Sequence, residues 1–449
     1  MPEPPHSYRS SETPVVLDLS QLGKEIAEKD KQRQNTYEVS REIQVALLQY
    51  RHEIESAANT TTLDASADTI RDKLKQHGTT SETTPPRTPR PANMSNKFED
   101  YCRVMAYRQF LATGGWLPPN HCFELCGATD EEYLAGAVMG LSRDLERYAL
   151  GRATARDVAS VKAARNLVNE ILDYLMQFDF RNGPLRRKYD GTKYALKTLE
   201  TLLYELSVTG AGDDEPEAKK AKTEGTAKPQ EELDAIRLRM EHRDKLRENL
   251  IKMCRDSQKA AKQAIYALHR GDHQKSADLI HKCEEAIQND LLPIVNEEPP
   301  LRSGSFANVV EEYVEAKLFH VWLLGKDESD ATTKGALLLP HDFAIDLQPE
   351  EYLGGLCDLT GEIGRYAVQR GTARDYDGVA MCLEANAAIS LAIQTLQRAP
   401  GGINKKMDQL RRSVEKIERM TYEMSLSKAA GINKSTEVTE TVEKADDGE

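Results

Sequence analysis

Apolar residues recur at steps of three and four along most of the chain. The segments LDYLMQFDF at 172–180 and YALKTLETLLYELS at 194–207 show this spacing, and the alternation of β-branched with polar residues that is typical of strands is nearly absent. A period near 3.6 residues places apolar side chains on one face of a helix. The sequence therefore predicts an all-α fold made of multi-helix bundles.

Four stretches interrupt this pattern because they have too few apolar residues to form a core. They are a disordered N-terminus at 1–15, a Thr/Pro/Arg-rich loop at 78–93, a linker at 210–231 and a disordered acidic tail at 429–449. The length of 449 residues also exceeds the usual size of a single hydrophobic core. We therefore expect two tandem domains, at 16–209 and 232–428.

The two halves of the chain repeat each other. RYALGRATARD at 147–157 returns as RYAVQRGTARD at 365–375, a shift of 218 residues, whereas EEYLAG at 131–136 returns as EEYLGG at 350–355, a shift of 219. The first copy therefore holds one extra residue between these two segments. An insertion within a helix is expected to rotate the residues that follow it by about 100°.

Two pairs of acids lie within apolar helical patterns of the second copy. Glu312 and Glu315 are three residues apart, and Asp358 and Glu362 are four apart, so that each pair shares one helix face. Carboxylates among apolar residues are costly unless they are neutralised, and a hard divalent cation neutralises several at once. Such a cation also activates water and shields a phosphodiester, so the four acids are candidate metal ligands and catalytic residues.

Acidic pairs at these spacings are also common on solvated helix faces, where basic residues pair with them. Lys317 and Arg365 are suitable partners here. Spacing alone therefore leaves both interpretations open, and neither pair shows that the two helices lie close together.

Comparison of the copies favours a site. Aligning FEDYCRV at 98–104 with VEEYVEA at 310–316 sets Arg103 opposite Glu315. The alternatives opposite Asp358 are Met139 and Gly140, and those opposite Glu362 are Arg143 and Asp144. The first copy thus lacks at least two of the four carboxylates, which predicts one catalytic half and one half that is not catalytic.

Several of these segments resemble the translin family. FDFRNGPLRRKYDGTKYALKTLETLLYELSVTG at 178–210 resembles the C-terminal helix of translin, and EEYVEA and EEYLGGLCDLTGEIGRYAV resemble segments of Trax. The resemblance covers 16–209 as a translin-like unit and 232–428 as a Trax-like unit. It implies an all-α subunit that assembles into a hollow barrel around RNA, with cleavage by the Trax subunits. The metal-binding acids of that family correspond to Glu312, Glu315, Asp358 and Glu362.

The resemblance also implies that the first half binds nucleic acid without cutting it. Translin has an Arg-Phe-His-Glu-His-Trp-Arg stretch where this chain runs from Lys97 to Arg103, so both flanking cations are present and both histidines are absent. Other candidate contacts to phosphate are Arg33, Arg247, Arg186, Arg187, Lys188, Lys405, Lys406, Arg411 and Arg412. Solvated or salt-bridged helix ends are the alternative interpretation of these basic residues.

Charge and cysteine usage indicate what kind of nucleic-acid contact and which cellular compartment to expect. The net charge of -13 excludes a generally basic nucleic-acid binder, so RNA contacts must come from local basic surfaces. Seven scattered cysteines suit a reducing compartment without disulfides, and His121, Cys122 and Cys126 lack the second ligand pair of a zinc site. No signal sequence or long apolar run is evident, so we expect a cytoplasmic or nuclear protein without a membrane partner. KKAK at 219–222 is a candidate nuclear-entry patch.

Together these features predict an endoribonuclease dependent on Mg²⁺ or Mn²⁺ that cuts single-stranded or short structured RNA, as in RNA silencing or the processing of tRNA fragments. The resemblance implies a homo-oligomer, or an assembly with translin-like subunits. Joining two halves that are usually separate chains fixes their ratio at one to one. The alternatives are a non-catalytic assembly that binds single-stranded RNA or DNA, and a helical scaffold without nucleic acid.

Overall fold

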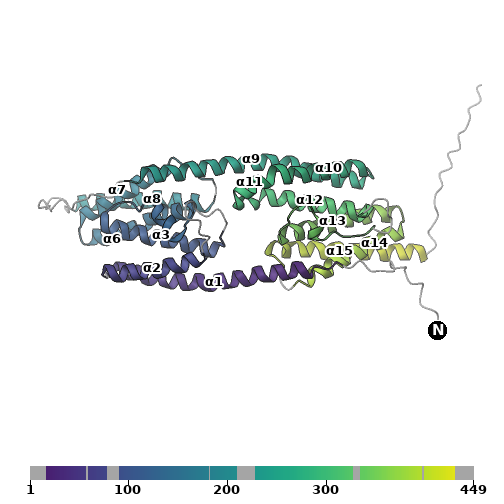
Figure 1. Ribbon diagram of the computed structural model, residues 1–449, viewed down its shortest axis with the longest axis horizontal. Coiled ribbons are helices and arrows are strands. Elements are labelled where there is room, and N and C mark those ends of the chain that lie inside the picture. Colours follow the sequence, from purple (N-terminus) through teal and green to yellow (C-terminus); the bar gives the residue numbers. More distant parts are fainter. Residues whose placement is uncertain are drawn as a thin grey trace, which may run out of the picture. The chain divides into compact units, whose positions relative to one another are not determined.

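The computed structural model describes residues 17–56, 59–77, 90–181, 183–209, 228–326, 334–396 and 399–429. Within these ranges the chain is almost entirely helical and has no strand (Figure 1), so the predicted all-α fold is confirmed. No helix in the described part is both long and apolar enough to cross a membrane. The loop, linker and terminal segments predicted from composition, and the patch at 219–222, lie outside the described residues, apart from residues 90–93, 228–231 and 429.

The described residues of the first repeat form eight α-helices and one π-helical turn. They are α1 (Ser20–Glu55), α2 (Thr60–His77), α3 (Ala92–Thr113), α4 (Pro119–Cys126), α5 (Asp130–Tyr133), the π turn (Leu134–Gly140), α6 (Leu141–Thr154), α7 (Val158–Leu175) and α8 (Pro184–Val208). α5 begins with a capping box, in which the Thr129 hydroxyl accepts from the backbone N–H of Glu132 and the Glu132 carboxylate accepts from the backbone N–H of Thr129.

The second repeat forms the remaining described helices. They are α9 (Gln230–His269), α10 (His273–Ala286), a π turn (Ile287–Leu291), α11 (Leu292–Glu297), α12 (Ser305–Leu324), α13 (Pro349–Thr372), α14 (Tyr376–Gln394) and α15 (Gly401–Ala429), with 3₁₀ turns at Pro299–Arg302 and Pro340–Asp342. α13 also starts with a capping box, between Gln348 and Glu351, at the position equivalent to that of α5.

Contacts divide the chain into two compact units. The N-terminal unit contains residues 29–251 and 293–303, and the C-terminal unit contains residues 17–28, 252–292 and 304–429. The division falls within α1, α9 and α11. The domain limits expected from the repeat, 16–209 and 232–428, keep α1 and α11 whole and leave only the first two residues of α9 outside the second domain.

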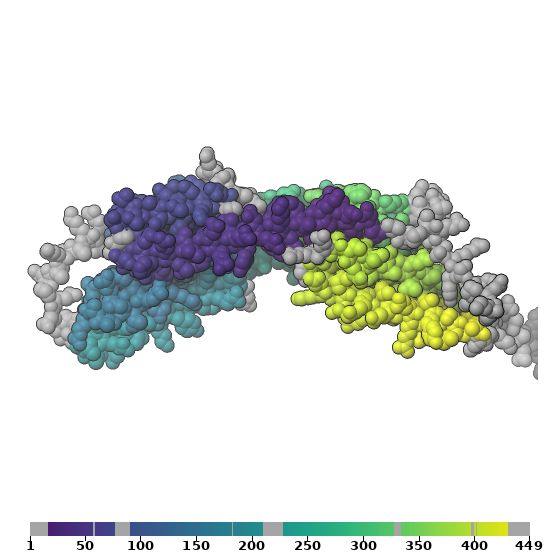
Figure 2. All heavy atoms as spheres, turned by 90° about the horizontal axis from the view of Figure 1, so that it is seen from below, coloured from purple at the N-terminus to yellow at the C-terminus, as the bar shows by residue number. Residues whose placement is uncertain are grey.

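The C-terminal unit is built around α13. This helix packs along α12 and also against α14 and α15, and the outer side of α15 is exposed on the face shown in yellow in Figure 2. Gly355 permits the close approach of α13 to α12, because a Cβ atom there would lie 2.7 Å from the carbonyl oxygen of Glu311. Gly136 of the N-terminal unit has the same relation to the carbonyl oxygen of Glu99. The two units therefore share the close helix contact that lies beside the candidate site.

The extra residue of the first repeat is absorbed by the π turn between α5 and α6. A π turn has one more residue in each hydrogen-bonded ring than an α turn, so it holds an insertion without rotating the helix beyond it. The expected rotation by about 100° is therefore wrong. Asp144, 218 residues before Glu362, is buried and faces Arg103, whereas Arg143 is exposed. Asp144 is thus the counterpart of Glu362.

Candidate functional site

The four acids predicted from the sequence lie where α12 and α13 pack together. Glu315 is at the centre of this group and is 8% exposed. Burial, together with the negative charges of Asp358, Glu312 and Glu362, raises the pKa of Glu315 to about 9. The structure therefore brings all four acids into electrostatic contact, and Glu315 is protonated at neutral pH unless additional positive charge reaches the group.

The other three carboxylates already have partners from neighbouring helices. The contacts are Asp358 Oδ2 with Lys406 Nζ at 2.7 Å, Glu312 Oε1 with Lys262 Nζ at 3.0 Å, and Glu362 Oε2 with His269 Nε2 at 2.5 Å. In the described part of the chain, no three carboxylate, imidazole or thiol groups are arranged to hold a metal ion. The acids fit a hard divalent cation by chemistry and by their need for positive charge, but their present contacts must rearrange to bind one.

The two cations considered as alternative partners contribute little to this group. Lys317 Nζ bonds to Glu284 at 2.6 Å rather than to Glu312 or Glu315. Arg365 lies 3.7 Å from Glu362, and its side chain is 57% exposed, so solvent screens this ion pair. Simple pairing with Lys317 and Arg365 therefore does not explain the acidic group.

Sequence reasoning missed two residues of the site. Glu311 accepts a hydrogen bond from Lys406 at 2.8 Å, and His269, whose side chain is 7% exposed, contacts Glu362 while its ring lies 4.9 Å from that of Phe319. The alignment of the two copies offered a signal for Glu311, because Glu99 occupies the same place two residues before the shared tyrosine of the first copy. His269 gave no such signal, since it comes from the end of α9.

The corresponding place in the N-terminal unit is occupied by arginine. Arg103, the counterpart of Glu315, places Nε 3.1 Å from Asp144, and Arg51 Nη2 lies 2.8 Å from the same carboxylate. Burial raises the pKa of Asp144, and the charges of Arg103 and Arg51 oppose that rise. This single buried acid thus has two guanidinium partners, and its charge is balanced without a metal.

The candidate nucleic-acid contacts lie on several helices of the N-terminal unit, and most are engaged in ion pairs. Arg33 bonds to Asp30 at 2.8 Å, Lys97 lies 3.5 Å from Asp100, and Arg186 lies 3.3 Å from Asp190. Arg103 pairs with Asp144, and Arg187 and Arg247 are exposed on α8 and α9. Intramolecular pairing lowers the charge available for phosphate. Arg187 and Arg247 are therefore the most accessible of the six, and Arg33 is exposed but paired.

The basic clusters at the starts of α8 and α15 also contain both residues held by carboxylates and residues that remain exposed. Lys188 bonds to Glu99, and Lys406 bonds to Glu311 and Asp358. These two lysines are 218 residues apart and make equivalent contacts with equivalent glutamates. Arg411 lies 3.0 Å from Asp408 and remains 69% exposed. Lys188 and Lys406 are therefore held by carboxylates, as in the salt-bridged alternative, and their contact with phosphate stays a prediction.

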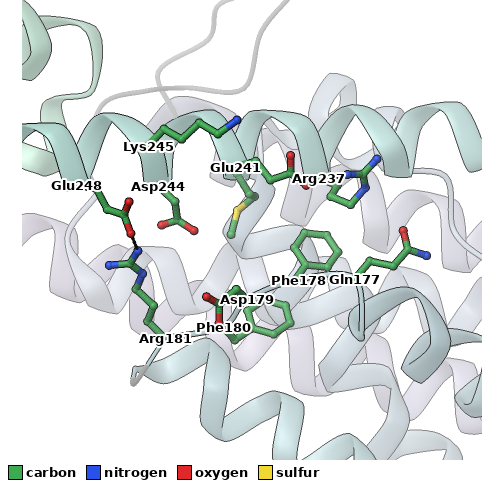
Figure 3. A pocket seen from close by; sticks show the side chains of 11 residues that line it. Gln177, Phe178, Asp179, Phe180, Arg181, Arg237, Glu241, Asp244, Lys245 and Glu248 are labelled. Carbon is green, nitrogen blue, oxygen red and sulfur yellow. Dashed lines mark hydrogen bonds and ion pairs between the residues drawn. The ribbon is translucent and has the colours of Figure 1, made fainter.

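A cavity of about 270 Å³ lies in the N-terminal unit, between the α7–α8 connection and the first part of α9 (Figure 3). Phe178 and Phe180 stack there at 5.2 Å, and Figure 3 shows Arg181 reaching Glu248 across the opening. Its full lining is Gln177, Phe178, Asp179, Phe180, Arg181, Arg237, Met240, Glu241, Asp244, Lys245 and Glu248. The lining includes none of the predicted site residues, and much of its charge is paired internally.

The cysteines carry no candidate chemistry. All seven are free and buried. Burial raises the pKa of Cys126, which lies close to Cys102 and Cys122 in the core of the N-terminal unit. Thiols of this kind stay protonated at neutral pH and are poor nucleophiles and metal ligands.

Several known proteins match parts of this sequence. The chain is 25% identical to the Translin-associated protein X homolog of Schizosaccharomyces pombe over 205 residues, which are 42% of this chain and 84% of that protein. It is 35% identical to Translin of Gallus gallus and 32% identical to Translin of Homo sapiens, each over 80 residues that are 18% of this chain. These matches span 34% and 35% of the two translins, about a third of their length.

Solved structures include a crystal structure of AfC3PO, which is 21% identical, covers 44% of this chain and 98% of that chain, and has a TM-score of 0.39. A second is the structure of an AfC3PO–duplex RNA complex, with 23% identity, 45% and 99% coverage and a TM-score of 0.38. The sequence model of the Translin family matches residues 31–210 and again residues 245–428. Since these two spans follow the internal repeat and make up most of the sequence, the chain belongs to the Translin family and carries two copies of its domain.

Proposed function

We propose that this protein is an endoribonuclease dependent on Mg²⁺ or Mn²⁺, in which the C-terminal repeat cuts RNA and the N-terminal repeat binds it. Single-stranded and short structured RNA are the proposed substrates. Membership of the Translin family and the similarity to a Trax homolog support this class of function. Self-association, or assembly with separate translin-like subunits, is part of the same proposal.

Glu315 is the observation that carries the proposal. A buried carboxyl group surrounded by three more acids is unfavourable as an element of a helix interface, because every ionised neighbour raises its pKa. A purely structural core has no need for such a group. The equivalent position of the other repeat holds Arg103, which lies 3.1 Å from Asp144 and 3.8 Å from Asp100, the two acids that this repeat retains. The two repeats thus differ in charge at the point where a cation would be needed.

Oxygen ligands from two helices would hold the ion: Glu312 and Glu315 from α12, and Asp358 and Glu362 from α13. A divalent ion held there lowers the pKa of a bound water and offsets charge on a phosphodiester. His269 fixes the orientation of Glu362 through its contact at 2.5 Å. The proposed RNA contacts are Lys97, Arg103, Arg33, Arg186, Arg187 and Arg247, which would attract the RNA backbone by charge.

Cleavage by the full-length Asp358→Asn variant tests this function. Asparagine preserves the size of the side chain but removes a negatively charged ligand, so we expect RNA cleavage in Mg²⁺ to fall at least about a hundredfold while RNA affinity stays within about twofold. Asp408→Asn is the matched control, since Asp408 is 67% exposed on α15. Undiminished cleavage by Asp358→Asn, or by the unchanged protein in excess EDTA, would contradict the proposal.

A second candidate function is a non-catalytic assembly that binds single-stranded RNA or DNA. It is favoured by the partners that Asp358, Glu312 and Glu362 already have, since a structural network would look the same. This function predicts a gel shift with RNA and no cleavage at any Mg²⁺ or Mn²⁺ concentration. The cleavage assay with metal and with EDTA therefore separates the two candidates.

A further inference from the structure

We propose that Lys406 makes metal binding depend on RNA, because it occupies Asp358 in the absence of RNA and transfers to a phosphate of bound RNA. The inference rests on the proposed function, since it assigns a control element to the same site. Lys406 then supplies positive charge to the acids in place of a metal ion. It leaves Asp358, and so allows the metal to bind, only when RNA is bound.

The contacts of Lys406 suit such a transfer. Its Nζ donates to Asp358 Oδ2 at 2.7 Å, to Glu311 Oε2 at 2.8 Å and to the carbonyl oxygen of Gly354 at 3.3 Å. An ammonium group has three hydrogens, so these acceptors use its full capacity. A phosphate oxygen replaces a carboxylate oxygen as acceptor without loss of a charge-assisted bond. The Lys406 side chain is 27% exposed, which leaves the group open to such an exchange.

The other repeat has one of these lysine contacts and lacks the other. Lys188, 218 residues before Lys406, bonds to Glu99, the counterpart of Glu311. At the place of Asp358 the first repeat has Met139 or Gly140, neither of which has a carboxylate. The lysine–glutamate pair is therefore a shared part of the scaffold, and only the contact with Asp358 is particular to the repeat that carries the acidic group.

Electrostatics gives the contact with Asp358 a consequence for metal binding. Lys406 uses one oxygen of a proposed ligand and adds a positive charge beside the site. A unit charge within about 5 Å of a divalent ion weakens its binding more than about tenfold, even at the dielectric constant of water. Transfer of Lys406 to a phosphate frees Asp358 Oδ2 and offsets the charge. Metal and RNA must then strengthen each other's binding by the same factor.

The experiment measures binding of Mn²⁺ to the full-length protein, without reference to cleavage, from the paramagnetic resonance signal of the free ion. We expect Lys406→Gln to bind Mn²⁺ about tenfold more tightly than the unchanged protein does. Lys406→Arg keeps the charge and should change the affinity by less than about threefold. Lys188→Gln removes the equivalent lysine from the other repeat and should leave the affinity unchanged. Thermal unfolding of both glutamine variants monitors the loss of the shared lysine–glutamate pair.

A second arm uses a short 2′-O-methyl RNA that resists cleavage. This RNA should tighten Mn²⁺ binding to the unchanged protein about tenfold and have little effect on Lys406→Gln. The inference is wrong if the RNA leaves Mn²⁺ affinity of the unchanged protein the same, a result that needs no variant. Equal effects of Lys406→Gln and Lys188→Gln also overturn it. If the unchanged protein does not bind Mn²⁺, or if Glu315→Gln binds it equally well, the proposed metal site itself is wrong.

Discussion

Replacing Glu315 with glutamine is predicted to stabilise the C-terminal unit at neutral pH in the absence of metal. The pKa of Glu315 in the folded protein is about 9, compared with 4.5 for an unperturbed glutamate. Between these values the folded state holds a proton that the unfolded state has lost, so stability falls as pH rises. The stability associated with this proton is complete below pH 4.5 and is lost as pH rises to about 9.

The size of the effect follows from the same two pKa values. Each pH unit between them costs about 1.4 kcal/mol, so at pH 7 the folded state has lost about 3 kcal/mol relative to its stability at pH 4.5. Glutamine resembles the protonated carboxyl group and does not titrate. The advantage of Glu315→Gln over the unchanged protein should therefore be small near pH 5 and about 3 kcal/mol at pH 7.

Fluorescence of a single tryptophan can follow this unit alone. The chain has two tryptophans, and Trp322 lies on α12, the helix that carries Glu315. In a Trp116→Phe background, urea unfolding at pH 5, 6, 7 and 8 measures the free energy of unfolding of the C-terminal unit. Glu415→Gln, exposed on α15, is the matched control and should show no dependence of this kind. Saturating Mg²⁺ should stabilise the protein with Glu315 and not the glutamine variant.

A free-energy difference between Glu315→Gln and the unchanged protein that does not vary from pH 5 to 8 would refute the assigned environment of Glu315. A difference that varies with pH but does not respond to Mg²⁺ would refute the metal site and leave the electrostatics intact.

Two further predictions concern the N-terminal unit. Arg103→Gln should weaken RNA binding and reduce the slope of log affinity against log salt by about one, measured by fluorescence anisotropy, whereas the 81% exposed Arg419→Gln should change neither; an unchanged slope would remove Arg103 from the RNA contacts. Gly136→Ala should lower the free energy of unfolding by about 1–3 kcal/mol, because its Cβ would fall on the Glu99 carbonyl, as followed by Trp116 fluorescence. Gly151→Ala in α6 has open space and should cause no loss, and equal effects of the two substitutions would contradict the close helix contact.

Helical periodicity and the internal repeat were sufficient to predict the all-α fold and its duplication. The four acids were also evident, because carboxylates within apolar helical patterns are unusual and the first repeat lacks at least two of them. Both signals are local in sequence or depend on comparing two copies of one segment. Neither requires knowledge of how distant helices pack.

The remaining parts of the site depend on tertiary packing. His269 lies 93 residues before Glu362 and reaches it only because the C-terminal end of α9 meets α12 and α13. Lys406 belongs to a basic run that is equally typical of phosphate binding, and only the structure shows its contacts with Glu311 and Asp358. The π turn also could not be predicted, because the sequence shows that a residue has been added but not which backbone hydrogen bonds change to accommodate it.

That π turn bears on how site residues are transferred between relatives. An alignment that forbids gaps within helices, counted from the Glu-Tyr sequence before the turn, would set Arg143 against Glu362 and report a reversal of charge. Counting from the other side of the turn, where the segment beginning at Arg147 repeats at a constant shift of 218, pairs Glu362 with Asp144 and reports only a shorter acid. One added codon has thus changed the numbering of this helix without changing which side chain faces its neighbour.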